Sequence, residues 1–94
     1  MHVRVVRFTD VSAERIAGLL ARIEAAGGPP PGVAATGLQI LFDEAQGTAI
    51  ALQQFDTAEA MHAGGKVFAA MDSAETPGTR ASVDLCEQKL ELRM

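Results

Sequence analysis

Several residue types that usually mark a function or a compartment are missing from this sequence. Tryptophan, tyrosine and asparagine do not occur, and the only aromatic side chains are four phenylalanines. Without asparagine the chain has no acceptor for an N-linked glycan. The single cysteine, Cys86, cannot form a disulfide within the chain, which indicates a reducing compartment and predicts a cytoplasmic protein.

Long apolar runs and an excess of positive charge are also absent. No stretch reaches the roughly 18 uncharged apolar residues that a membrane-spanning helix needs. The first residues carry Arg4 and Arg7 instead of the apolar core of a signal peptide. Lys and Arg number 8 against 12 Asp and Glu, which gives a net charge of −4. We therefore expect neither a membrane nor a nucleic acid as partner, since nucleic-acid phosphates select basic surfaces.

The length fits one domain that spans residues 1–94. A fold of this size buries only roughly 60–65% of the surface that its unfolded chain exposes. Its core alone therefore gives marginal stability, and association with a second copy is expected. Alanine is abundant and arginine clearly outnumbers lysine, a bias that indicates a GC-rich bacterial genome.

Four segments have the composition and alternation of β-strands, and two have the period of helices. Strands are predicted at 2–9, 36–42, 48–55 and 80–92. One helix is expected between a cap at Asp10 or Ser12 and Gly27, and the other between Asp56, which opens a capping-box pattern, and about Asp72. The order β-α-β-β-α-β predicts an α+β, ferredoxin-like fold, with both helices on one face of a four-stranded antiparallel sheet.

Alternation along the strands assigns their residues to two faces of the sheet. Parity predicts a helix-covered face made of Val3, Val5, Leu38, Ile40, Phe42, Ile50, Leu52, Val83 and Leu85. The opposite face then holds Arg4, Val6, Phe8, Gln39, Leu41, Ala49, Ala51, Gln53, Phe55, Ser82, Asp84 and Cys86. This mixture of apolar, small and neutral polar residues is typical of a buried surface, so we expect a homodimer formed through it. Parity changes between Leu85 and Leu90, which a β-bulge or a strand end that reaches another subunit would explain.

Two segments, PGVAATGLQILFDEAQGTAIALQQFDT and MDSAETPGTRASVDLCEQKLEL, are similar to small actinobacterial proteins. Together with the order of elements and the length, they resemble the dimeric α/β-barrel superfamily, in its antibiotic-biosynthesis-monooxygenase-like branch. The resemblance implies a homodimeric α/β barrel. Quinone-forming monooxygenases of that superfamily use Asn and Trp in their pocket, and the haem-degrading branch adds a His ligand on the second helix. This chain has neither Asn nor Trp, so neither set of pocket residues can be transferred to it. Only His62, on the second expected helix, matches a residue type used by the haem-degrading branch.

The second expected helix carries the residues from which a ligand site could be built. We expect an apolar cavity between this helix and the sheet, lined by Met61, His62, Phe68 and Met71. His62 is the candidate general base or ligand of a metal or haem, against the alternative of an exposed helix residue. One His and one Cys do not make a metal site, so we expect no metal, haem or other cofactor.

Three further features have both a functional and a structural interpretation. Gly64 and Gly65 either open space for a ligand or allow close packing on the sheet, and we expect one to be packed and the other exposed. Arg4 and Asp84 are expected to face each other on neighbouring strands, where the pair orients a polar ligand or fixes the register of a dimer interface. Cys86 is expected to be a buried apolar residue and not a nucleophile.

These features predict a small homodimeric protein that binds a small hydrophobic ligand. One alternative is a cofactor-independent monooxygenase-like or isomerase-like enzyme acting on a hydrophobic, polyketide-like substrate, for which the protein supplies a dry pocket, one base and orientation. Another alternative is a dimer with a structural or interaction role. A deep cavity with His62 pointing into it would favour the enzyme, whereas a helix packed flat on the sheet would favour the roles without chemistry.

Overall fold

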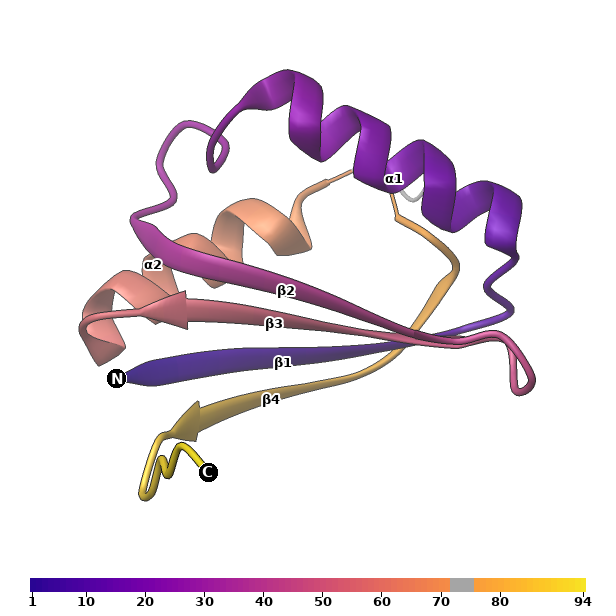
Figure 1. Cartoon of the computed structure of the whole chain (residues 1–94). Coiled ribbons are helices and arrows are strands. Elements are labelled where there is room, and N and C mark those ends of the chain that lie inside the picture. The colour runs from indigo at the N-terminus through magenta and orange to yellow at the C-terminus, as the bar shows by residue number, and fades with distance from the viewer. Residues whose placement is uncertain (72–75) are drawn as a thin grey trace.

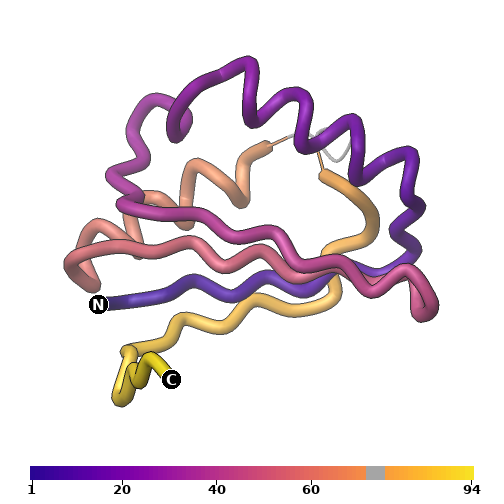
Figure 2. The backbone as a smooth tube through the Cα atoms, viewed as in Figure 1, coloured from indigo at the N-terminus to yellow at the C-terminus, as the bar shows by residue number. Residues whose placement is uncertain are grey.

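The computed structural model describes residues 1–71 and 76–94, and its elements follow the predicted order (Figure 1). They are β1 (His2–Thr9), α1 (Ala13–Ala26), β2 (Ala35–Asp43), β3 (Thr48–Phe55), α2 (Ala58–Ala69) and β4 (Thr79–Glu87). The strands form one antiparallel sheet in the order β2-β3-β1-β4, and both helices lie over the same face of it (Figures 1 and 2). This is the predicted ferredoxin-like α+β arrangement.

The bounds of α1 follow from the residues at its two ends. The Ser12 side chain accepts a hydrogen bond from the backbone N–H of Arg15 and so caps the first turn. Gly27 ends the helix with φ 70°, a left-handed conformation that glycine adopts without strain. Both signals were readable in the sequence, and the prediction for this helix is confirmed.

Helix α2 begins one residue later than its sequence pattern predicts. The cap is Thr57, whose hydroxyl accepts from the backbone N–H of Ala60, and Asp56 precedes it. The described helix ends at Ala69, and the predicted end at Asp72 falls outside the described residues. Neither helix in the described part of the chain combines the length and hydropathy needed to cross a membrane.

The structure reverses the predicted facing of β1 and β3. Their helix-covered side carries Arg4, Val6, Phe8, Ala49, Ala51, Gln53 and Phe55, and their open side carries Val3, Val5, Ile50 and Leu52. The facing of β2 and β4 is as predicted. The prediction was wrong because both sides of β1 and β3 are largely apolar, so alternation identifies a strand without telling which side is buried.

Buried residues on the covered face form two clusters. One lies beneath the first half of α1 and contains Val6, Phe8, Val11, Ile16, Ala49 and Ala51. The other lies beneath α2 and contains Val33, Phe55 and Met61. Phe55, 0% exposed, is the centre of this second cluster. Each helix is therefore fixed to its own part of the sheet.

Strand β4 ends at Glu87 instead of the predicted Leu92. Residues 88–94 have no regular secondary structure. The change of parity between Leu85 and Leu90 therefore falls across the end of the strand and needs no bulge at that point. The register shift of β4 lies at its other end, where it pairs with the last residues of β1.

Candidate ligand cavity

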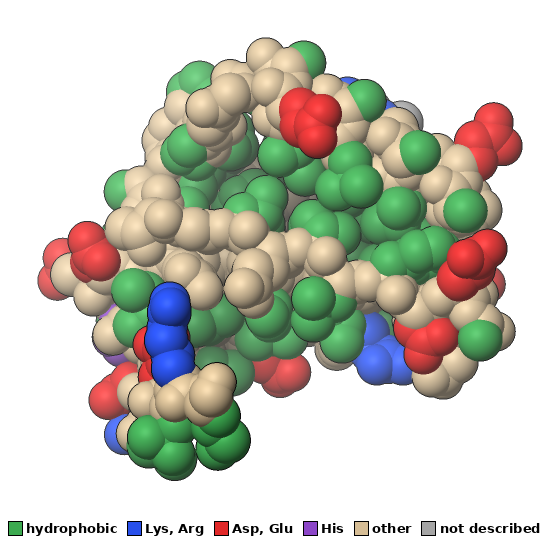
Figure 3. Space-filling model, viewed as in Figure 1, with side chains coloured by type: hydrophobic (Ala, Val, Ile, Leu, Met, Phe, Trp, Pro, Cys, Tyr) green, Lys and Arg blue, Asp and Glu red, His purple; other side chains and the backbone are tan. Residues whose placement is uncertain are grey.

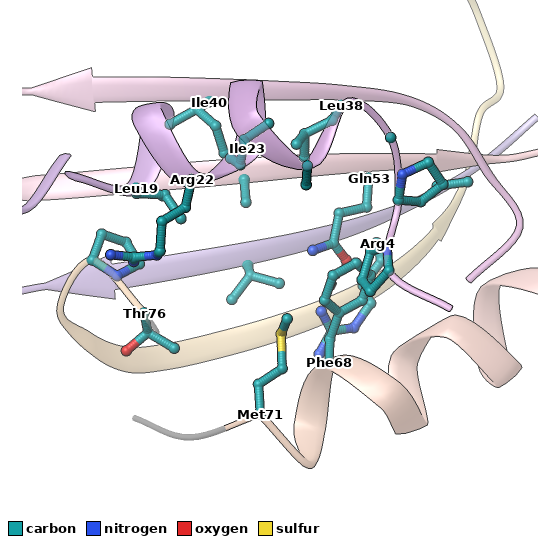
Figure 4. A pocket seen from close by; sticks show the side chains of 18 of the residues that line it. Arg4, Leu19, Arg22, Ile23, Leu38, Ile40, Gln53, Phe68, Met71 and Thr76 are labelled. Carbon is teal, nitrogen blue, oxygen red and sulfur yellow. Dashed lines mark hydrogen bonds between the residues drawn. The ribbon is translucent and has the colours of Figure 1, made fainter. Parts of the chain in front are cut away.

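A cavity of ≈ 680 Å³ lies between α1, the end of α2 and the covered face of the sheet. Its volume falls within the roughly 300–1,000 Å³ typical of small-molecule sites. Figure 3 shows a hollow between α1 and the sheet in which hydrophobic side chains gather. In Figure 4, Leu19 and Ile23 of α1, Leu38 and Ile40 of β2, and Met71 border the same space. The lining is thus mainly apolar and comes from both layers of the fold.

The cavity remains open because the two helices approach the sheet differently. α2 packs closely, since a Cβ atom at Gly64 would lie 2.8 Å from Cε1 of Phe55. The buried residue of α1 is Ile16, near its start, whereas Ile23, farther along, borders the cavity. Residues 27–31, which follow α1, continue the lining. Space is therefore left beneath the C-terminal half of α1.

The described charged residues that line the cavity are all arginines. Arg4 comes from β1, Arg22 from α1 and Arg80 from β4. Within residues 1–71 and 76–94, no aspartate or glutamate belongs to the lining. A concave apolar site with charge of one sign attracts ligands of the opposite charge.

Arg4 is held at the cavity wall by two contacts. Only 4% exposed, it donates from Nη1 to Oε1 of the buried Gln53 at 2.9 Å, and its guanidinium carbon lies 5.4 Å from the centre of the Phe68 ring (Figure 4), within cation–π distance. Burial lowers the pKa of the Arg4 guanidinium below its ordinary value, and the charge of nearby Arg80 lowers it further. A guanidinium nevertheless stays charged at neutral pH.

The cavity was predicted between α2 and the sheet, whereas the structure packs α2 closely and places the cavity beneath α1. Two of the four residues predicted to line it nevertheless border this cavity. Phe68 and Met71 border it, while Met61 is buried in the cluster around Phe55. His62 is exposed and lies outside the lining, because consecutive helix positions point about 100° apart and Met61 takes the direction of the sheet. Within the described chain, no three His, Cys, Asp or Glu side chains gather as a metal ion would require.

The predicted pairing of Arg4 with Asp84 is wrong. Arg4 is opposite Leu85 in the sheet, and Asp84 is opposite Val5, so Arg4 and Asp84 lie on different faces. The error follows from the reversed facing of β1. Cys86, predicted to be buried, is exposed on the open face, where β4 forms an edge of the sheet.

The two consecutive glycines of α2 both face side chains of the sheet. Gly64 is buried, and its missing side chain leaves room for Phe55. Gly65 is half-buried, and a Cβ atom there would lie 3.4 Å from Nε of Arg4. The prediction that one of the two is packed is confirmed at Gly64, whereas Gly65 is not fully exposed but gives room to the cavity arginine.

The contributions of α1 and β4 to the cavity were not predicted from the sequence. Leu19 and Ile23 were visible as part of the apolar face of α1, but that pattern predicts packing on the sheet and does not show where a helix stands away from it. Arg22 and Arg80 carried no local signal, because their positions at the cavity depend on tertiary structure.

Comparisons of this chain with models of protein families, with curated proteins and with solved structures found no match. The fold and the cavity therefore carry the functional argument.

Proposed function

We propose that the protein binds a small hydrophobic molecule in the cavity between α1 and the covered face of the sheet. The observation that carries the proposal is the cavity of ≈ 680 Å³ with its mainly apolar lining from both helices and the sheet. Protein interiors are normally packed with few voids larger than a water molecule. A space of this size, bordered by Leu19, Ile23 and Ile40, would gain buried apolar contact from an apolar ligand.

The position of His62 favours binding over the alternative of a monooxygenase-like or isomerase-like enzyme acting on a hydrophobic substrate. A general base must come within hydrogen-bond reach of the proton that it removes, and His62 is exposed outside the cavity lining. The described charged groups of the lining are arginines, which keep their proton at neutral pH. These groups suit the binding and orientation of a ligand.

The test is a fluorescence titration with N-phenyl-1-naphthylamine, a neutral apolar dye, excited directly. We expect saturable binding, and we expect Leu38→Trp, which fills part of the cavity, to weaken it by about tenfold, or about 1.4 kcal/mol. Leu41→Trp is the matched control, because Leu38 and Leu41 belong to the same strand and are 44% and 49% exposed, but only Leu38 borders the cavity. The absence of saturable binding, or equal effects of the two variants, would contradict the proposal.

We also propose that two copies associate through the open face of the sheet. This face carries the partly exposed apolar side chains of Val3, Val5, Leu41, Ile50 and Leu52. Leu90 and Leu92, which follow β4, are 74% and 66% exposed and add apolar surface. An exposed apolar face of this kind typically marks an interaction site. Together with the ferredoxin-like order of elements, this face supports the proposal that the chain belongs to the dimeric α/β-barrel superfamily. The antibiotic-biosynthesis-monooxygenase-like, actinobacterial branch is proposed from the sequence resemblance alone.

Sedimentation velocity at micromolar concentration tests the association. The wild-type protein is expected to be a dimer because of its exposed apolar face, and its interface should bury the area of about 1,200–2,000 Å² in total that is typical of stable complexes. Leu41→Glu on the open face should give a monomer, whereas Leu20→Glu on α1, at a leucine of similar exposure, should leave the dimer intact. A wild-type monomer would refute association through this face.

A further inference from the structure

We propose that the ligand of the cavity carries a carboxylate, which Arg4 binds together with Arg80 while the apolar body of the ligand lies beneath α1. This inference rests on the proposed function, because it concerns the same cavity. It adds the chemical class of the ligand, an organic acid with a long apolar part, and the residues that recognise its acidic end.

The first support is the unused hydrogen-bonding capacity of Arg4. A guanidinium has five N–H donors, and in the described chain only Oε1 of Gln53 accepts from Arg4. No fully buried side-chain nitrogen or oxygen of the described residues lacks a partner. The Nε and Nη2 atoms of Arg4 are therefore accessible, and Arg4 lines the cavity. Guanidinium N–H groups form the planar fork that two carboxylate oxygens match.

The second support is the charge around Arg4. Within residues 1–71 and 76–94, no carboxylate forms an ion pair with it, and its charged neighbour is Arg80, which donates from Nη2 to the carbonyl oxygen of Phe68 at 3.2 Å. The two cations repel each other, and burial of a charge without a counter-charge is unfavourable. A carboxylate bound between them would reduce both penalties.

The third support is that Arg4 is fixed before any ligand binds. Gln53 holds Nη1, and Phe68 lies against the guanidinium, as Figure 4 shows. Gly65 leaves space above the side chain. Because these contacts restrict the rotamer of Arg4, a ligand need not order it on binding, which favours affinity.

The placement of the remaining lining residues assigns the apolar end of the ligand. Leu19 and Ile23 of α1 and Ile40 of β2 border the cavity together, at a distance along the sheet from Arg4 (Figure 4). A ligand whose carboxylate reaches Arg4 would extend its alkyl or aryl part toward these side chains. The cavity therefore fits a molecule with one acidic end and one apolar end.

The test compares decanoate with decanol as competitors of bound N-phenyl-1-naphthylamine at neutral pH, where decanoate is ionised. We expect decanoate to bind the wild-type protein at least about tenfold more tightly than decanol, which is the scale of one charge-assisted contact. Arg4→Met should abolish this preference and leave the affinity for decanol within about twofold, because the apolar stem is kept. Arg80→Met should reduce the preference in part.

The matched control is Arg7→Met, because Arg7 lies on the same strand as Arg4 but is exposed on the open face. It should leave the preference for decanoate unchanged. Circular dichroism of each variant reports whether it folds, and Arg80, which is exposed, provides a second test should Arg4→Met fail to fold.

The outcomes separate this inference from the proposed function. Dye binding with equal affinities for decanoate and decanol overturns the carboxylate site and leaves the apolar cavity in place. If Arg7→Met reduces the preference for decanoate over decanol as much as Arg4→Met does, the preference comes from the overall charge of the protein, and the carboxylate site is also overturned. Failure of the dye, decanol and decanoate to bind contradicts the proposed function itself.

Discussion

The two faces of the sheet are both rich in apolar side chains, but they differ in the size of those at the centre. On the covered face, β3 contributes Ala49 and Ala51, whereas on the open face it contributes Ile50 and Leu52. The small side chains leave space between β3 and α1. The large side chains cover the open face of the same strand. The comparison indicates that beneath α1 the small side chain of Ala51, which lines the cavity, leaves space that a large side chain would fill.

The comparison is tested most strongly by truncating one large side chain on each face. Phe55→Ala should lower the free energy of unfolding by about 3–5 kcal/mol, because it leaves a hole in a fully buried cluster. Leu41→Ala, on the open face, should change it by no more than about 0.5 kcal/mol when it is measured at a protein concentration low enough for the chain to be monomeric. Urea unfolding of both variants gives the two values, and similar losses would remove the distinction between the faces.

A smaller effect is expected from adding one methyl group at two helical glycines. Gly64→Ala should destabilise the fold by about 1–3 kcal/mol, because the new Cβ atom would press on Phe55. Gly18→Ala in α1 is the matched control: its Cβ atom would approach only the Arg22 side chain, at 3.7 Å, so the gain in helix propensity should stabilise the protein by about 0.5–1 kcal/mol. Thermal unfolding measures both changes, and stabilisation by Gly64→Ala would contradict close packing of α2.

The smallest expected change concerns the buried charge in the cavity wall. Replacing Arg4 and Gln53 together, by Met and Leu, should raise the stability of the ligand-free protein by about 1 kcal/mol, since apolar replacements of buried ionic groups are often stabilising. Arg4→Met alone should leave the stability unchanged or lower it by up to about 2 kcal/mol, because Oε1 of Gln53 loses its donor at a cost of about 1–3 kcal/mol. Denaturant midpoints decide the matter, and a large loss in the double variant would show that Arg4 serves stability instead of ligand recognition.

Much of the fold was predictable because local signals mark the ends of its elements. Ser12 and Gly27 enclose α1, and β3 occupies the predicted range 48–55. The facing of β1 and β3 was not predictable, because a strand with apolar residues on both sides satisfies either orientation. The pairing of Arg4 with Asp84 failed for the same reason, since a change of one position moves every side chain to the other face.

The candidate site was predictable only where it lies on one helix. Phe68 and Met71 were expected beside a cavity from the apolar pattern of the second predicted helix, and they border the cavity beneath α1; their role in ligand binding stays a prediction. The cluster of Arg4 with Arg80 depends on the pairing of β1 with β4 and on the position of α2 over the sheet. Such contacts between distant segments leave no periodic signal in the sequence.

Binding of an organic acid beneath α1 is tested most directly by a crystal structure of the protein with 10-bromodecanoate, in which anomalous scattering locates the bromine. We predict the carboxylate within hydrogen-bond distance of the Arg4 guanidinium and the bromine beneath α1, beside Leu19 and Ile23. Bromine on the open face of the sheet, or a cavity that stays empty at saturating ligand, would contradict the account.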